Sequence, residues 1–275
     1  MNNTFNLNRF GKYFVYDLKR QWKNIGMLML IFALFPIIFY MLYIFFAALF
    51  YGGLFKTFTG IEINGPAMWT RFGVFAVMTT IFVMLFPSRA YGEVTDKAKG
   101  SEWLMLPASR MEKFTSMMLI TLVVIPILYI AVYLLSDAFV CLLDKSCGDS
   151  LMSFRINKEI GTPDFTVPAN GFWILAANIV EYAIIFLLGG LIFKKWKVVG
   201  TVLVLFVLGM VFSGLLSAFI FNADLEWWDS WFTDWTIRHA DHLDLWLNAF
   251  INFWILLIFA ICGTWSWFRL KRLQH

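Results

Sequence analysis

The chain has 275 residues, of which 60% are hydrophobic and only 15% charged, and its net charge is +4. A soluble domain usually carries about a quarter charged residues, so the composition excludes an ordinary soluble globular protein. In so apolar a chain a small positive charge bears on membrane topology and not on nucleic-acid binding, and no nucleic-acid partner is expected.

The first 26 residues are polar and basic, and their spacing predicts a cytoplasmic amphipathic helix. Phe10, Phe14, Leu18 and Trp22 recur every four residues. Cations occupy much of the remainder: Arg9, Lys12, Lys19, Arg20 and Lys23. Such a helix lies in the headgroup plane, with its bulky apolar groups in the membrane and its cations against anionic lipid. A disordered basic tail is the alternative, but it does not account for the regular aromatic spacing.

Blocks of about twenty apolar residues follow, each long enough to cross roughly 30 Å of hydrocarbon. Six spans are expected, near residues 27–50, 68–86, 114–135, 172–193, 198–221 and 247–268. Pro126 can kink the third span, and the short turn at 194–197 predicts an antiparallel fourth and fifth span. The predicted fold is an all-α polytopic membrane protein, with one amphipathic interfacial helix (1–26) and a single six-span domain (27–268).

The distribution of Lys and Arg predicts the orientation of these spans. Sixteen of the 22 cations lie in four segments: 1–26, 87–113, 194–197 and 269–275. Cations accumulate in short cytoplasmic segments, so both termini, including the tail 269–275, are expected in the cytoplasm. The external segments are then 51–67, a loop at 136–171 and an aromatic segment at 222–246.

The cytoplasmic loop 87–113 is the most informative segment. Gly100 and Ser101 could start a short helix with Glu102 near its positive end, and Pro107 would end it. Such a bounded helix would lie against the membrane and face the cytoplasm.

This loop carries a candidate docking surface, followed by a cap for the third span. Trp103, Leu104 and Leu106 are apolar residues offered to the cytoplasm, which is typical of a docking surface. A loop that merely lies at the membrane interface fits the same residues. Ser109 can cap the third span, with Glu112 at the capping-box position.

The run Gly-Ser-Glu-Trp-Leu-Met-Leu-Pro-Ala-Ser-x-x-Glu-Lys at 100–113, entered from Arg89 and Glu93, resembles a loop of ABC transporter permeases of the type-two exporter class. Those permeases show Gly-Thr/Ser-x-x-x-Leu-x-x-Pro-x-Ser between their second and third spans, and the wording here is similar to permeases from Bacteroidetes. The remaining resemblance is architectural: an amphipathic N-terminal helix, six spans, both ends inside, and a longer external segment between spans five and six.

In that family the loop forms a coupling helix that sits in a groove of a separate ATP-hydrolysing subunit. The resemblance implies that the following residues lie at or beside this contact: Glu93, Gly100, Ser101, Glu102, Trp103, Leu104, Leu106, Pro107, Ser109 and Glu112. It also implies two permease subunits, as a homodimer or heterodimer, and two ATPase subunits in a bacterial cytoplasmic (inner) membrane. The chain has no P-loop pattern, so we expect a transport subunit and not an enzyme. ATP and Mg would be bound by the partner, and no cofactor by this chain.

The external segment 222–246 carries four tryptophans: Trp227, Trp228, Trp231 and Trp235. Three of them are spaced by four residues and so share a helical face. In the resembling family this region forms short helices that dip into the outer leaflet near the exit of the pathway. A passive aromatic belt and a lid over the exit are both open.

Glu181 is the acidic residue deepest inside a predicted span, about half-way along the fourth. An ionisable group there costs about 3 kcal/mol on insertion scales and is a functional candidate by default. Asn178 and Tyr182 are neighbours able to hydrogen-bond. An interhelical structural bond and a role in the substrate pathway or gating are both open.

The cysteines and histidines complete the candidate sites. Cys141 and Cys147 share an external loop and could form a disulfide or stay as free thiols, whereas Cys262 is expected to pack within a span. His239 and His242 are too few for a convincing metal site, so no metal is expected.

Two other classes of function remain open beside the transport subunit. One is a non-transporting membrane scaffold or assembly factor. The other is a lipid-acting membrane enzyme with Glu181 as its acid or base. The chain shows no Ser/His/Asp, His-Glu-x-x-His or paired intramembrane carboxylate pattern of a hydrolase.

Overall fold

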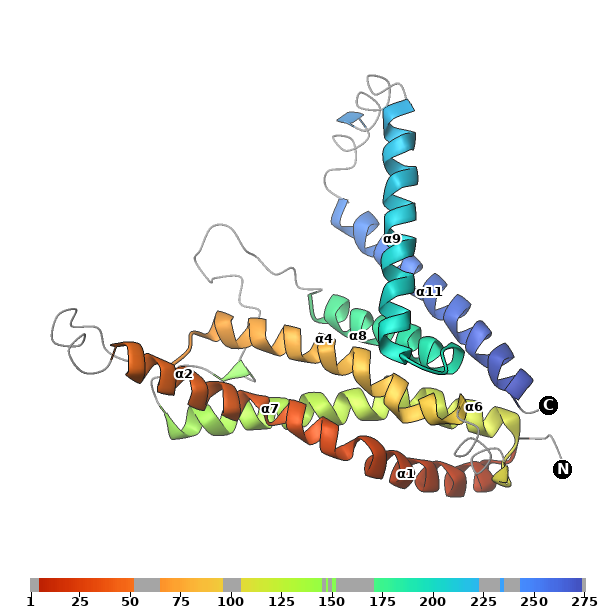
Figure 1. Ribbon diagram of the computed structural model, residues 1–275, viewed down its shortest axis with the longest axis horizontal. Coiled ribbons are helices and arrows are strands. Elements are labelled where there is room, and N and C mark those ends of the chain that lie inside the picture. The colour runs from red at the N-terminus through yellow and green to blue at the C-terminus, as the bar shows by residue number, and fades with distance from the viewer. Residues whose placement is uncertain are drawn as a thin grey trace.

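The computed structural model describes residues 5–51, 65–95, 105–144, 147, 150–151, 171–222, 233–234 and 243–273. Most of these residues are helical, and none of them lies in a strand. The helices are α1 (Leu7–Ala33), α2 (Phe35–Tyr51), α4 (Met68–Gly92), α6 (Arg110–Leu119), α7 (Ile125–Leu143), α8 (Gly171–Ile192), α9 (Lys197–Asn222) and α11 (Leu243–Leu273). A 3₁₀ turn, η1 (Glu93–Thr95), follows α4, and a π-helical turn, η2 (Ile120–Val124), joins α6 to α7 (Figure 1).

Within the described ranges, five helical segments are long and apolar enough to cross a membrane: Leu7–Leu49, Met68–Thr95, Arg110–Leu143, Lys197–Phe219 and Asn252–Arg272. The part of α8 at Ala176–Ile192 is a shorter apolar helix. Large apolar side chains such as Phe206, Leu215 and Phe253 are more than half exposed, as residues that face lipid tails would be. The fold is therefore that of an all-helical, multi-pass membrane protein. The count of six spans stays a prediction.

The first helix differs from the amphipathic segment expected at 1–26. It begins at Leu7, where the Asn6 side chain accepts hydrogen bonds from the backbone N–H groups of Asn8 and Arg9, and it continues without interruption to Ala33. The first strong breaker is Pro36, which lacks a backbone N–H and disfavours helical conformation in the residue before it. The helix boundary consequently lies at Leu34 and not near residue 26.

The third apolar segment contains a π-helical turn immediately before Pro126, the residue expected to disturb it. Within η2 the backbone N–H of Ile125 donates to the carbonyl of Ile120, five residues earlier. This wider turn lies immediately before the proline, whose ring would collide with a regular helix turn. The helix then runs to Leu143, so residues 136–143 of the predicted external loop are helical.

A column of aromatic rings joins α4 to α7 in the buried core. The rings of Phe82 and Tyr129 stack with centroids 4.3 Å apart, and those of Phe75 and Tyr133 lie 4.8 Å apart. Phe82 and Phe86 are fully buried. The α4 helix continues through Pro87 to Gly92, six residues beyond the predicted end of the second span.

Two adjacent glycines let α8 approach its neighbours closely. A Cβ on Gly190 would lie 3.0 Å from the Ser88 Cα of α4, and one on Gly189 would overlap the Thr201 hydroxyl of α9. Small residues at such positions allow helix backbones to pack tightly in membranes. The expected antiparallel pairing of the fourth and fifth spans is not observed, because α9 turns steeply away from the bundle after the turn at 193–196 (Figure 1).

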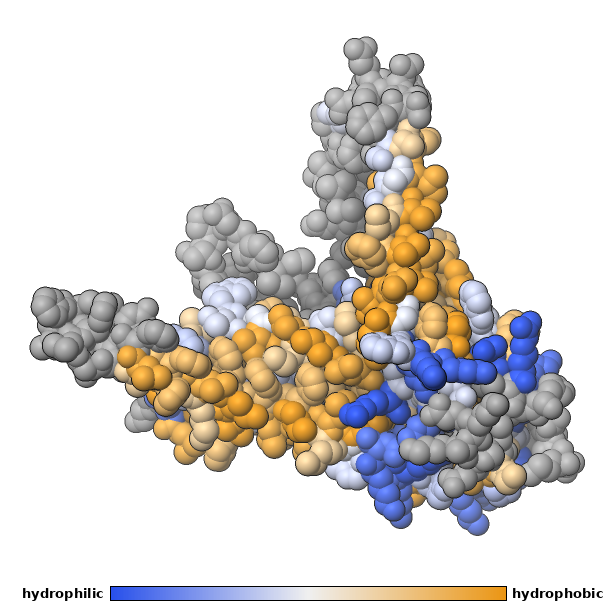
Figure 2. All heavy atoms as spheres, in the orientation of Figure 1, coloured by the Kyte–Doolittle hydropathy of each residue, from blue (hydrophilic) through white to orange (hydrophobic). Residues whose placement is uncertain are grey.

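Hydrophilic side chains gather at one end of the bundle, which we call the polar end (Figure 2). It carries the start of α1, the end of α4, the start of α6, the turn between α8 and α9, and the end of α11 (Figure 1). The described parts of the four cation-rich segments therefore lie at the same end, and the side of the membrane that this end faces stays a prediction.

Candidate functional site at the polar end

Residues predicted from the sequence lie at the end of α4 and at the start of α6. Glu93 is the C-cap of α4, and its carboxylate accepts a 3.5 Å hydrogen bond from the Asn24 side chain of α1. The chain is helical at Met105 and then bends at residues 106–108, around Pro107. Ser109 follows as the N-cap of α6.

The predicted capping box at the start of α6 is present. The Ser109 hydroxyl accepts from the backbone N–H of Glu112 at 3.3 Å, and the Glu112 carboxylate accepts from the backbone N–H of Ser109 at 2.8 Å. Two of the orphan N–H groups at this helix end are thereby satisfied.

Glu112 also fixes the beginning of α1 to the beginning of α6. Its Oε1 accepts from the backbone N–H of Asn6 at 2.9 Å and from Nη2 of Arg9 at 2.8 Å, and its Oε2 accepts from Nε of Arg9 at 2.8 Å. The Glu112 side chain is fully buried, whereas that of Arg9 is about one-third exposed. A carboxylate in this position is stable because a forked guanidinium and two backbone N–H groups replace its hydration.

Further along α1, Asp17 connects three helices. Its Oδ2 accepts hydrogen bonds from the Tyr91 hydroxyl of α4 at 2.9 Å and from the Ser116 hydroxyl of α6 at 2.8 Å. Gln21, one turn along α1, donates to Oδ1 at 3.5 Å. Asp17, Tyr91 and Ser116 are each at most 1% exposed, so these bonds replace water at the carboxylate and join α1, α4 and α6 as one unit.

The turn between α8 and α9 is attached to the same region. The Lys197 ammonium, at the start of α9, donates a 2.5 Å hydrogen bond to the Gly92 carbonyl at the end of α4. A cation is favourable there because the last carbonyls of a helix carry partial negative charge. The end of α4 is thus in contact with both α1 and α9.

The predicted docking residues divide into described and undescribed ones. Gly100, Ser101, Glu102, Trp103 and Leu104 lie outside the described residues. Leu106 is partly buried and packs against the core, so only part of its side chain is open to a partner. Its neighbour Met105 is 80% exposed and was missed, because a sequence pattern does not determine which side of a short bend faces inward.

The other predicted residues lie elsewhere. Glu181 is half-buried at the middle of α8, Asn178 is half-buried one turn before it, and Tyr182 is exposed. Cys262 of α11 is a free, half-buried cysteine within electrostatic range of Glu181. The four tryptophans of the aromatic segment, Trp227, Trp228, Trp231 and Trp235, and the two histidines, His239 and His242, lie outside the described residues.

At the end of the bundle opposite the polar end, sequence reasoning missed a buried ion pair. Arg71 of α4 donates from Nη1 to both carboxylate oxygens of Asp137 on α7 at 3.0 Å, and Nη2 donates to the carbonyl of Cys147 at 3.0 Å. Asp137 also accepts from the backbone N–H of Leu151. Cys147 is disulfide-bonded to Cys141, with the Cα atoms 5.2 Å apart, so the pairing left open by the sequence is formed.

A signal for each missed carboxylate or cation was present in the sequence. Asp17 is the single acidic residue among the first 26, where the other charged residues are cations. Arg71 is the one cation outside the polar segments that flank the predicted spans. An ionisable residue in such surroundings generally has a specific partner.

Among the described residues, no group of three or more His, Cys, Asp or Glu is placed to hold a metal ion. At the polar end, hydrogen bonds join the start of α6 and the end of α4 to α1, and the end of α4 to α9. No family model matches the chain, and no curated protein or solved structure matches it.

Proposed function

We propose that the chain is the membrane subunit of an ATP-driven exporter, which docks a separate ATPase through the 87–113 loop. The observation that carries this proposal is the 100–113 motif, whose C-terminal part begins α6 with a capping box and a fully buried Glu112. A surface on which a partner pushes must be attached rigidly to the helices it moves. The bonds of Glu112 to Arg9 and of Asp17 to Tyr91 and Ser116 supply such an attachment.

In this proposal, ATP-driven closure of the partner ATPases displaces the loop. The displacement passes to α1, α4 and α6 as a packed unit, because interfaces of this kind shift between discrete arrangements and do not deform continuously. A second copy of the chain, or a homologue, would complete the translocation pathway. Glu181, Asn178 and Tyr182 remain its candidate lining residues, and the tryptophans at 227–235 candidate lid residues.

The test is co-purification with a P-loop ATPase encoded next to the gene for this chain. Met105→Asp places a charge on an 80% exposed side chain of the loop and avoids the packed Leu106. We expect it to abolish ATPase co-purification and the stimulation of ATP hydrolysis by the membrane subunit.

Trp196→Asp is the matched control. Trp196 is 77% exposed in the turn between α8 and α9, also at the polar end, and its φ of 56° is a conformation that Asp adopts more readily than most residues. We expect ATPase binding to survive this change. Retained binding in Met105→Asp, or labelling of Lys97 and Lys99 from the external side of the membrane, would contradict the docking proposal. The unchanged chain should stimulate ATP hydrolysis by its partner, whereas a non-transporting scaffold protein would not.

A further inference from the structure

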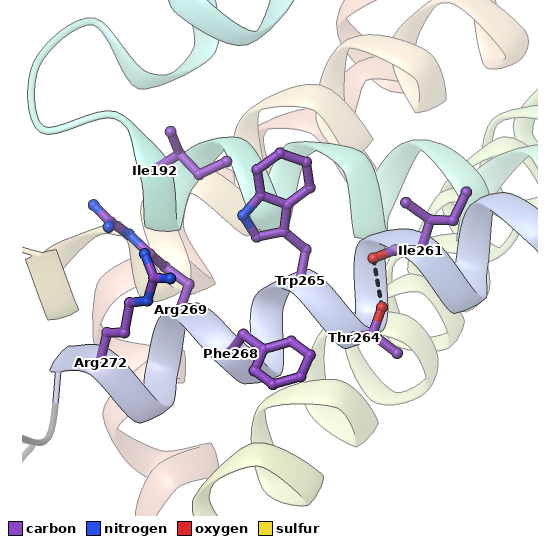
Figure 3. Close-up of a pocket in the computed structure, with 7 residues that line it drawn as sticks. All are labelled: Ile192, Ile261, Thr264, Trp265, Phe268, Arg269 and Arg272. Carbon is purple, nitrogen blue, oxygen red and sulfur yellow. Dashed lines mark hydrogen bonds between the residues drawn. The ribbon is translucent and has the colours of Figure 1, made fainter.

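A groove of about 620 Å³ lies beside the last three turns of α11, where this helix passes the end of α8 (Figure 3). Seven described residues line it: Ile192, Ile261, Thr264, Trp265, Phe268, Arg269 and Arg272. Two of the seven are arginines and none is acidic. The groove therefore has a net positive charge.

The two arginines gather at one end of the groove. In Figure 3 the side chains of Arg269 and Arg272 extend to the same side of α11, toward the end of α8 that carries Ile192. Arg269 is half-buried, and its Nε donates a 3.4 Å hydrogen bond to the Leu191 carbonyl. Because this bond uses only Nε, the terminal amino groups of the guanidinium remain for a ligand in the groove. A guanidinium fork recognises phosphate oxygens in pairs.

The groove becomes apolar along α11 from the arginines toward Ile261. Ile261, Trp265 and Phe268 are spaced by four and three residues, so they share one face of α11 with Arg272. Each of the three is between 53% and 60% exposed. The Thr264 hydroxyl on the same wall donates to the carbonyls of Ala260 and Ile261 within its own helix. It therefore does not need a hydrogen-bond acceptor from a ligand.

One kind of ligand matches this groove, which combines a cationic end, an indole beside it and an apolar stripe along a membrane-crossing helix. An anionic phospholipid carries a phosphate at one end and acyl chains at the other, and basic pockets between membrane helices bind such headgroups. A tryptophan at the level of the headgroups is also favourable. We infer that the groove between α8 and α11 binds one anionic phospholipid, with its phosphate on Arg269 and Arg272 and an acyl chain along Ile261, Trp265 and Phe268.

This inference does not depend on the proposed transport function. It requires only that the end of α11 lies at the membrane surface, whichever partner binds the loop. A lipid in this place would bridge α8 and α11, the two helices that form the groove.

Photocrosslinking of the full chain in lipid nanodiscs tests the inference. The probes are phosphatidylglycerol and phosphatidylcholine with the same photoactivatable acyl chain, and labelled peptides are mapped by mass spectrometry. We expect phosphatidylglycerol to label the α11 segment at 252–273 more than phosphatidylcholine does, relative to labelling of the exposed helix α9. Equal labelling by the two lipids on α11 would overturn the inference.

Variants assign the effect to the arginines. Each cation near the membrane surface contributes about a five-fold preference for anionic lipid, so Arg272→Gln should lower the lipid preference about five-fold and the Arg269→Gln/Arg272→Gln pair by about thirty-fold. The matched control is Lys12→Gln/Arg89→Gln, which removes two exposed cations of the polar end outside the groove and should leave the preference of α11 unchanged. An unchanged preference in the groove variants would overturn the inference.

Two further arms of the experiment distinguish charge from side-chain shape, and a bound lipid from a free phosphate ion. Arg269→Lys/Arg272→Lys keeps both charges and should retain most of the preference, whereas a loss as large as that of the glutamine pair would contradict the assigned role of charge. Inorganic phosphate is added as a competitor at the concentration of the lipid probe. We expect no competition; complete competition would identify a site for the free ion and refute the lipid proposal.

Discussion

The most direct test of the polar network is the removal of Asp17. In Asp17→Ala the hydroxyls of Tyr91 and Ser116, both buried, lose the oxygen to which they donate at 2.9 and 2.8 Å. A buried polar group left without a partner costs about 1–3 kcal/mol. A serine in a helix can turn its hydroxyl to the carbonyl four residues earlier, so Ser116 escapes most of this cost. Tyr91 has no such alternative within its own helix.

We therefore expect Asp17→Ala to lower the free energy of unfolding by about 2–4 kcal/mol, most of it from the Tyr91 hydroxyl and the lost charge-assisted bonds. Asp17→Asn should cost about 1 kcal/mol, because the remaining carbonyl oxygen still accepts hydrogen bonds. The control is Lys19→Ala, which removes an exposed charge from the same helix and should change stability by less than about 0.5 kcal/mol.

The decisive variant is Asp17→Ala/Tyr91→Phe. Because it removes the hydroxyl that the first change leaves buried, it should be more stable than Asp17→Ala alone by about 1–3 kcal/mol. Reversible unfolding of the purified chain in mixed micelles with increasing SDS, followed by far-UV circular dichroism, measures these differences. Tyr91→Phe alone is measured as well. If the double variant loses as much stability as Asp17→Ala and Tyr91→Phe lose together, the Tyr91 hydroxyl does not donate to Asp17 and the account of this network is wrong.

Two other predictions concern the remaining buried charges. Arg71→Met should destabilise the chain by about 3–5 kcal/mol because it leaves Asp137 charged and buried, and Arg71→Met/Asp137→Leu should recover most of that loss in the same unfolding assay; a double variant no more stable than the single one would contradict this. Glu112→Ala removes the carboxylate to which Arg9, Asn6 and Ser109 donate, so trypsin should cleave after Arg9 several-fold faster than in the unchanged chain. Glu93→Ala is the control for that experiment, and equal cleavage in both variants would argue against the anchoring role of Glu112.

Local signals were sufficient for several features of the fold. The bounds of α8 and α9 lie within one residue of the expected spans, because each apolar block ends beside the polar turn at 193–196. The Ser109–Glu112 capping box follows from a spacing of three residues, and the irregular turn before Pro126 follows from one proline ring. In each case the controlling interaction lies within a helical turn of the residue that reveals it.

The features that the sequence missed depend on partners far away along the chain. Asp17 and Tyr91 are 74 residues apart, and Arg71 and Asp137 are 66 residues apart. Phe10, Phe14, Leu18 and Trp22 were expected to face the membrane, and nothing in the sequence indicated which other face of the helix packs on the protein. That face carries Tyr13, Asp17, Gln21, Ile25 and Met29. Polar residues occupy the inner face because α4 and α6 supply their hydrogen-bond partners, and no local pattern contains that information.

The positions of these polar contacts divide the molecule mechanically. Asp17 and Glu112 bind α1, α4 and α6 together near the polar end, and the Arg71–Asp137 pair binds α4 to α7 near the opposite end. The α9 helix is attached to α4 through Lys197, and much of its apolar surface is exposed. A bound polar network costs several kcal/mol to break within a membrane, whereas apolar contacts between helix and lipid exchange at little cost. The buried Ser88 hydroxyl of α4 also donates a 3.0 Å hydrogen bond to the Phe186 carbonyl of α8, so α8 belongs to the same body. Force applied near the end of α4 and the start of α6 should consequently move α1, α4, α6, α7 and α8 together, with the displacement taken up where that body meets α9 and α11.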